Sequence, residues 1–280
     1  MIRETKIGEM RKNNFGTDMK IISYGKRGNV RVKFLDAYGY ETETIYNNFK
    51  KGQIRNPYDK TVYGVGYLGE GDYKVYIDQK RLEPRYNVWR TLLGRCCTEK
   101  HREQFKAYGN CEVCEEWMNY QVFSQWYEEN FYQVGTERMH IDKDILIPGN
   151  RLYSPDTCMI VPQRINMLFL HKPNKYGLPN GVKPRAHGKY SAEYKKKFLG
   201  IFDSVEEAEL AHEKEKKKAI IEIAEEYKEK IPTRLYKALL AWEPILKGGN
   251  YSEIQSRNCG NIQKVCRSGS TGRRCSLSGN

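Results

Sequence analysis

Residues 139–166, MHIDKDILIPGNRLYSPDTCMIVPQRIN, decide how the central part of the chain folds. Residues 139–146 have the composition of a strand, and Pro, Gly and Asn at 148–150 predict a turn. A second apolar run at 158–161 predicts another strand. Pro162 is suited to open a helix, to which the following residues supply apolar side chains. The expected order is strand, loop, strand, helix.

The N-terminal part, residues 1–82, reads as a small β-rich domain. Residues 19–24 and 30–34 alternate polar and apolar side chains around Gly28-Asn29, which predicts a hairpin. Glycines stand between aromatic residues further along and suit bends in a curved sheet. The further strands expected here are residues 45–49, 63–67 and 73–77.

Apolar and aromatic side chains recur at spacings of three and four over residues 85–130, which is helical periodicity. We interpret this stripe as core. With the strand and helix segment that follows, it predicts one domain over residues 85–172. The stripe consists of Trp89, Leu92, Leu93, Val113, Trp117, Tyr120, Phe123 and Trp126.

The C-terminal part begins after a Pro- and Gly-containing linker at 173–180. Three short strands are expected, then a helix of about six turns that Asp203 or Ser204 can cap. Pro232 interrupts the pattern before a last short helix, which completes a module over residues 181–246. Residues 248–280 are basic and lack periodicity, so we expect a disordered tail. The fold class expected for the chain is α+β.

Charge points to a polyanionic partner. The 280 residues contain 48 Lys and Arg against 35 Asp and Glu, a formal net charge of +13. Nucleic acid is the favoured partner, and an anionic membrane surface is the weaker alternative. No apolar run approaches the length of a membrane-spanning helix, and the N-terminus has no apolar signal core. We therefore expect a cytoplasmic protein without a membrane partner, in which cysteines serve as thiols or metal ligands.

Several motifs occur in an order that resembles a group of bacteriophage HNH (ββα-metal) nucleases. The chain has W-x-x-L-L-x-R-C at 89–96, V-C-x-E-W at 113–117 and F-x-x-W at 123–126. It then has DKDILIPGN at 142–150 and YSPDTCMIVPQRIN at 153–166. The resemblance implies a phage protein in a bacterial host cell that hydrolyses DNA phosphodiesters with Mg²⁺ or Mn²⁺.

The site implied by this resemblance departs from the family pattern. Lys143-Asp144 stands where the family has Asp-His, so Asp144 would be the general base. Regular strand alternation would put His140, Asp142 and Asp144 on one face, and His140 is then a second candidate base. Asp142, Asp144 and the helical Asn166 would be the metal ligands, and Asn150 the loop residue that orients the base. The alternative is a decayed site that only retains its shape.

A second resemblance covers residues 181–227. GKYSA at 188–192 and LGIFDSVEEA at 199–208 are similar to motifs of AP2 domains, which lay a three-stranded sheet into the major groove of DNA. The resemblance implies contacts to double-stranded DNA, with phosphate contact better supported than base reading because Arg and Trp are scarce on these strands. The exposed positions carried over are Lys183, Arg185, Lys189, Tyr190, Glu193, Lys195, Lys196 and Lys197.

The spacing of the cysteines also suggests a zinc site. Cys111-x-x-Cys114 has the spacing of a metal knuckle, which Cys96 or Cys97 with His101 could complete. A zinc ribbon would have two such pairs, and the helical setting favours Cys96 and Cys114 as small core residues. We therefore do not expect zinc.

Three functions remain open from the sequence. The leading one is a divalent-metal-dependent, homing-type DNA endonuclease. The second is a non-enzymatic DNA-binding protein with a decayed nuclease core. The third is a phage protein that uses these folds to bind a host protein.

Overall fold

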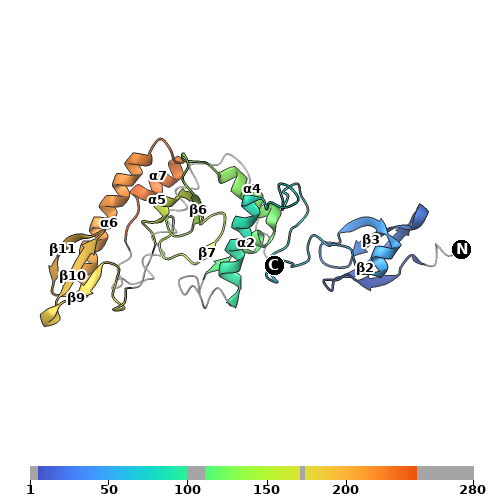
Figure 1. Cartoon of the computed structure of the whole chain (residues 1–280), viewed down its shortest axis with the longest axis horizontal. Coiled ribbons are helices and arrows are strands. Elements are labelled where there is room, and N and C mark those ends of the chain that lie inside the picture. Colours follow the sequence, from blue (N-terminus) through green and yellow to red (C-terminus); the bar gives the residue numbers. More distant parts are fainter. Residues whose placement is uncertain (1–5, 100–110, 171–173, 245–280) are drawn as a thin grey trace, which may run out of the picture. The chain divides into compact units, whose positions relative to one another are not determined.

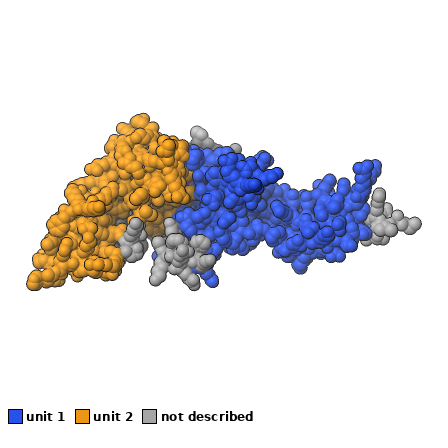
Figure 2. All heavy atoms as spheres, viewed as in Figure 1, with its two compact units in different colours: residues 1–132, 151–156 blue, residues 133–150, 157–280 orange. Residues whose placement is uncertain are grey.

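The computed structural model describes residues 6–99, 111–170 and 174–244 (Figure 1). It contains helices and strands, as the α+β class requires. Contacts divide the chain into two compact units, coloured separately in Figure 2. Unit 1 is residues 1–132 with 151–156, and unit 2 is residues 133–150 with 157–280. This division passes through the range 85–172 that the sequence suggested as one domain.

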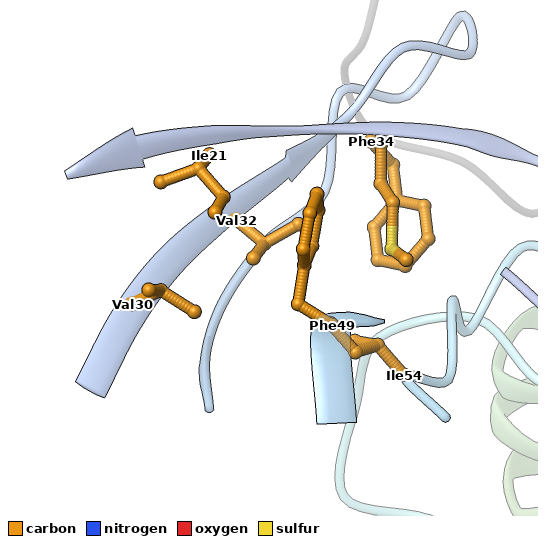
Figure 3. Close-up of a cluster of buried hydrophobic side chains, with 7 residues drawn as sticks. Ile21, Val30, Val32, Phe34, Phe49 and Ile54 are labelled. Carbon is orange, nitrogen blue, oxygen red and sulfur yellow. The ribbon is translucent and has the colours of Figure 1, made fainter. Parts of the chain in front are cut away.

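A four-stranded antiparallel sheet forms the first part of unit 1. Its strands are β1 (Met10–Lys12), β2 (Asp18–Tyr24), β3 (Asn29–Phe34) and β4 (Glu41–Ile45), paired in chain order. The predicted hairpin is confirmed as β2 and β3. The inward residues of these strands meet Phe49 and Ile54 in a buried cluster, most of which is labelled in Figure 3. The cluster consists of Met19, Ile21, Val30, Val32, Phe34, Phe49 and Ile54.

The strand predicted at 45–49 is wrong. Residues Tyr46–Lys50 form the short helix α1, which turns Phe49 into the core of the sheet. Because one helical turn places a single side chain inward, the segment needs no strand partner.

The strands predicted at 63–67 and 73–77 are also wrong. Only isolated bridges occur there among the described residues, such as Val62 to Gly66. A Cβ on Gly66 would lie 2.4 Å from the Leu93 side chain and 3.0 Å from Trp89. The glycine therefore permits close approach to a helix, which sequence reasoning took for curvature of a sheet.

Helices form the second part of unit 1. Helix α2 (Pro84–Cys97) begins at a proline, and the Glu83 side chain accepts from the backbone N–H of Tyr86. The 3₁₀ turn η4 (Glu115–Met118) and α4 (Tyr120–Asn130) follow, and β5 (Glu112–Val113) pairs in parallel with β7 (Leu152–Tyr153). All eight residues of the predicted aromatic and apolar stripe are buried, which confirms their role as core.

Unit 2 begins with the predicted strand, loop, strand and helix order, in shorter form. Strand β6 (Met139–Asp142) pairs antiparallel with β8 (Met159–Pro162), and α5 (Gln163–Asn166) follows directly. The strand predicted to reach residue 146 therefore ends at 142, and the helix is one turn long.

The rest of unit 2 is a sheet with a long helix. Strands β9 (Val182–Pro184), β10 (Tyr190–Tyr194) and β11 (Lys197–Phe202) form an antiparallel sheet with β10 in the middle. A 3₁₀ turn, η5 (Ala186–Gly188), joins β9 to β10. Helix α6 (Val205–Tyr227) is capped by Ser204, and α7 (Thr233–Leu240) comes after Pro232. These strands and helices confirm the elements predicted from the sequence.

Helix α6 has two buried regions. Ala208 in its first half packs with Val182 of β9 and Ala192 of β10. Ile220, Ile223, Ala224 and Tyr227 in its second half are buried as well. The guanidinium of Arg164, next to β8, makes two hydrogen bonds to the Glu226 carboxylate, at 2.6 and 2.9 Å. The helix therefore contacts both the sheet and the strand pair of unit 2.

The linker predicted at 173–180 is partly structured. The Asn174 amide donates to the carbonyls of Pro179 and Val182 and accepts from two backbone N–H groups, while Leu178 packs against the sheet core. The tail predicted at 248–280 lies outside the described residues. No helix in the described ranges is long and apolar enough to cross a membrane.

The glycine contact in unit 1 gives a stability prediction. Gly66→Ala should lower the free energy of unfolding by about 1–3 kcal/mol, because the new methyl group meets the buried side chains of Leu93 and Trp89. Gly25→Ala is the control, since its nearest contact would be an ordinary 3.6 Å and its φ is −96°. Urea unfolding of both variants measures the difference, and equal stabilities would contradict the close packing.

Candidate functional site

Asp142 is the buried carboxylate of the β6 loop. Its residue is 8% exposed, and its Oδ1 accepts from the backbone N–H groups of Asp144 and Ile145, each at 2.8 Å. Burial, with the nearby charge of Asp144 as the second cause, raises the pKa of Asp142 to about 6. The side chain therefore closes a turn at the strand end and carries an unfavourable charge at neutral pH.

This turn separates two residues that the sequence placed together. We expected His140, Asp142 and Asp144 on one strand face, but β6 ends at Asp142 and Asp144 lies in the loop. The expected alternation is wrong for Asp144, because the backbone turns back to donate to the Asp142 carboxylate where a regular strand would have continued.

Asp144, the candidate base, is held by its neighbour. The Lys143 ammonium donates to Asp144 Oδ2 at 2.7 Å, with the lysine side chain 10% exposed and the aspartate side chain 37% exposed. A carboxylate oxygen that accepts from a buried ammonium is engaged with that cation. The ion pair with Lys143 therefore gives Asp144 a structural role in the loop, which needs no catalytic role to explain it.

The two asparagines of the predicted site differ in role. Asn150 donates from Nδ2 to the carbonyl of Lys143 at 3.1 Å, so it closes the loop between β6 and β7. Asn166 is the last residue of α5, on the element that follows β8. No group of three or more His, Cys, Asp and Glu side chains in the described ranges is placed to hold a metal ion. The predicted ligand set of Asp142, Asp144 and Asn166 stays a prediction.

The candidate zinc residues lie in unit 1. Cys96 is buried in α2, Cys111 is buried just before β5, and Cys97 is half-buried at the end of α2. Burial raises the pKa of the Cys114 thiol to about 11, so in the metal-free chain it is protonated at neutral pH. His101 lies outside the described residues.

The sheet of unit 2 has one covered face and one open face. Tyr190, Leu199 and Phe202 pack with Val182, Ala192 and Ala208 on the side of α6. Lys183, Ser191 and Ile201 stand opposite one another in the register, so they share the other face. The ion pair of Lys183 with Glu193, at 2.7 Å, lies on this open face.

Of the basic residues predicted to bind DNA, Lys183, Arg185 and Lys189 lie at or around the open face. Arg185 donates from Nε to Ser191 Oγ at 3.0 Å, and Lys189 pairs with Asp203 at 2.6 Å. The predicted position of Lys197 is wrong, because it pairs with Glu215 of α6 at 2.5 Å and its cross-strand partner Tyr194 packs against His212 of the same helix. Tyr190 was predicted to be exposed on the DNA-binding face. In the structure it is half-buried against the core on the side of α6.

Lys195 and Lys196 form the tip of the β10–β11 hairpin. Tyr194 pairs with Lys197, so these two lysines are a two-residue turn. Their φ angles are 46° and 69°, in the left-handed region that type I′ turns require and that Asn and Gly adopt best. Each lysine in this conformation lowers the stability of the fold by on the order of 1 kcal/mol. The tip therefore carries two positive charges although Asn and Gly would suit its backbone better.

Sequence reasoning missed two exposed apolar residues beside these charges. Phe198 is 61% exposed and Ile201 is 57% exposed, both on β11. Strict alternation would put Phe198 on the covered face with Phe202. Gly200, inside the strand, was the available signal that alternation fails there.

Comparison with known proteins adds no assignment. No family model, curated protein or solved structure matches the chain.

The buried carboxylate gives a pH-dependent prediction. The raised pKa of Asp142 favours the protonated form in the folded state, so its stabilising contribution is full below about 3.8 and is lost as pH rises through about 6. Asp142→Asn keeps the acceptor for both N–H groups and removes the charge. It should raise the free energy of unfolding at pH 7.5 by about 2–3 kcal/mol, with little gain at pH 4.

Asp78→Asn is the matched control. Asp78 Oδ1 accepts from the N–H groups of Lys80 and Arg81 in the same pattern, but the residue is exposed and these bonds lower its pKa. This variant should not be stabilised at pH 7.5. Denaturant unfolding at both pH values measures the differences, and an Asp142→Asn variant no more stable than wild type at pH 7.5 would contradict a buried charge.

Proposed function

We propose that this protein binds double-stranded DNA through the open face and hairpin tip of the β9–β11 sheet. The observation that carries the proposal is the concentration of positive charge there. The whole sheet segment, residues 181–203, contains six Lys or Arg and two acidic residues, a formal net charge of +4, and Lys197 is the one of the six that pairs with α6. Charge of this density attracts the phosphate backbone and releases its counterions.

The ion pairs on this sheet are compatible with DNA contact. Lys183 and Lys189 are paired with Glu193 and Asp203, but all four side chains are at least 40% exposed. Exposed ion pairs contribute little to stability, so a phosphate can replace the carboxylate partner. Lys195 and Lys196 at the tip are positioned for phosphates at the edge of a groove.

The width of the sheet is compatible with binding in the major groove of DNA. Three strands span roughly 10 Å, and the major groove is about 12 Å wide. Helix α6 packs behind the sheet, which leaves the other face for the ligand. This arrangement agrees with the AP2-like motifs of residues 188–208, and it would act in the cytoplasm of a bacterial host, as that phage-type resemblance implies.

A second candidate function is DNA cleavage by the β6–β8–α5 segment. The observation that favours it is the strand, loop, strand and helix order in the segment whose motifs resemble HNH nucleases. The pairing of Asp144 with Lys143 and the turn role of Asp142 favour a binding protein over an active nuclease. Incubation with supercoiled DNA in Mg²⁺ or Mn²⁺, with and without chelator, decides between them.

The hairpin tip gives the test of DNA binding. Lys195→Asn/Lys196→Gly supplies residues that suit a type I′ turn and removes two charges. We expect a higher melting temperature and about tenfold weaker binding to duplex DNA at ~100 mM salt. The slope of log K against log salt should fall in magnitude by about 1.8, since each phosphate contact contributes about 0.9.

The control removes the same charge from Lys218 of α6 and from Lys228, the residue that follows its last turn. Lys218→Ala/Lys228→Ala should leave both affinity and slope near wild type, because α6 covers the opposite face of the sheet. Fluorescence anisotropy with a labelled duplex measures all three proteins. Equal losses in both double variants would point to charge anywhere on the unit and contradict binding through the tip.

A further inference from the structure

The open face of the β9–β11 sheet carries two large apolar side chains in addition to its charges. Phe198 and Ile201 are both more than half exposed. The hydrophobic core of this sheet is made by other residues, among them Leu199 and Phe202 on the same strand. The fold therefore does not require Phe198 and Ile201 to be apolar.

A bulge in β11 brings both side chains to the same face. Ala192 stands opposite Gly200 and Glu193 opposite Phe198, so Leu199 is an extra residue in the ladder. Residues 198 and 201, three apart, would otherwise lie on opposite faces. Gly200, next to the extra residue, has a φ of 139°, a backbone conformation that glycine adopts more readily than other residues. Bulges of this kind re-aim side chains, and this one turns Phe198 away from α6.

The surroundings of this pair favour DNA as the occupant. Ile201 is in the same cross-strand row as Lys183 and Ser191, and Arg185 is bonded to Ser191. Phe198 stands opposite Glu193, directly after the lysines of the hairpin tip. An apolar pair beside Lys183, Arg185 and the hairpin lysines, where Glu193 is paired with Lys183, fits a polyanion that also presents apolar groups. In the major groove, the C5-methyl group of thymine is such a group.

We propose that Phe198 and Ile201 contact thymine methyl groups in the major groove, and that this protein therefore prefers sites containing thymine. The inference rests on the proposed DNA binding and names the bases that the sheet reads. Backbone phosphates, held by the lysines, supply affinity without sequence information. The apolar pair supplies discrimination.

The test replaces thymine by deoxyuridine, which lacks only the methyl group. A preferred duplex is first selected from a random pool with the full chain, and each thymine of that duplex is then replaced in turn. We expect thymine in the selected site and about fourfold weaker binding of wild type for each contacted methyl group that is lost, the equivalent of burying one such group.

Phe198→Ala/Ile201→Ala should bind the thymine and deoxyuridine duplexes equally well. Its circular dichroism and melting temperature should match wild type, because both side chains are exposed. Ile221→Ala, which shortens an exposed apolar residue of α6, is the control and should retain the thymine preference.

Each other outcome overturns the inference in a distinguishable way. Wild type that binds the thymine and deoxyuridine duplexes equally would reject methyl contact while the proposed DNA binding stands. Absence of any duplex binding would remove both. A change of oligomeric state in Phe198→Ala/Ile201→Ala, with DNA discrimination unchanged, would assign the apolar pair to a protein interface.

Discussion

Helix α6 is the element on which the arrangement of unit 2 depends. Its 23 residues bury one set of side chains against the sheet and a second set in its last turns. The sheet core is small, with Val182, Ala192 and Ala208 at its centre, and three short strands cannot bury enough apolar surface alone. The helix therefore supplies the surface that both parts of the unit need.

The second end of α6 combines apolar burial with a charged contact. Tyr227 is 1% exposed, accepts from Arg164 at 3.2 Å and donates to the Glu137 carboxylate. Arg164 also binds Glu226 with two hydrogen bonds, a geometry that fixes direction as well as distance. Glu137 precedes β6 and Arg164 follows β8, and Met139 pairs with Pro162, so these contacts hold one end of the strand pair to the helix.

Much of this architecture could be predicted from local patterns. Ser204 before Glu206 and Glu207 marks the start of α6, and the strands 182–184, 190–194 and 197–202 follow from short apolar runs between turn residues. The patterns failed where a single residue depends on a distant partner. Gly66 is small because Trp89 and Leu93 lie against it, which spacing along the chain does not reveal.

The candidate site was less predictable than the fold, for a related reason. Alternation assumed that β6 continues through Asp144, but the Asp142 side chain bonds to its own backbone and ends the strand. In β11, the extra residue Leu199 reverses the expected faces, so Phe198 becomes exposed. Both errors come from a local backbone irregularity, and such irregularities concentrate near functional surfaces.

The two candidate sites of unit 2 lie at separate positions along α6. His212 packs against Tyr194 of the sheet, and Glu226 binds Arg164 beside the strand pair. Fourteen residues of helix separate these contacts, roughly 20 Å at a rise of about 1.5 Å per residue. Because α6 covers the face of the sheet opposite the proposed DNA surface, a duplex on the open face does not lie along the helix. The β6–β8 segment would therefore need a contact of its own with DNA, so the proposed binding by the sheet and the proposed cleavage are independent of each other.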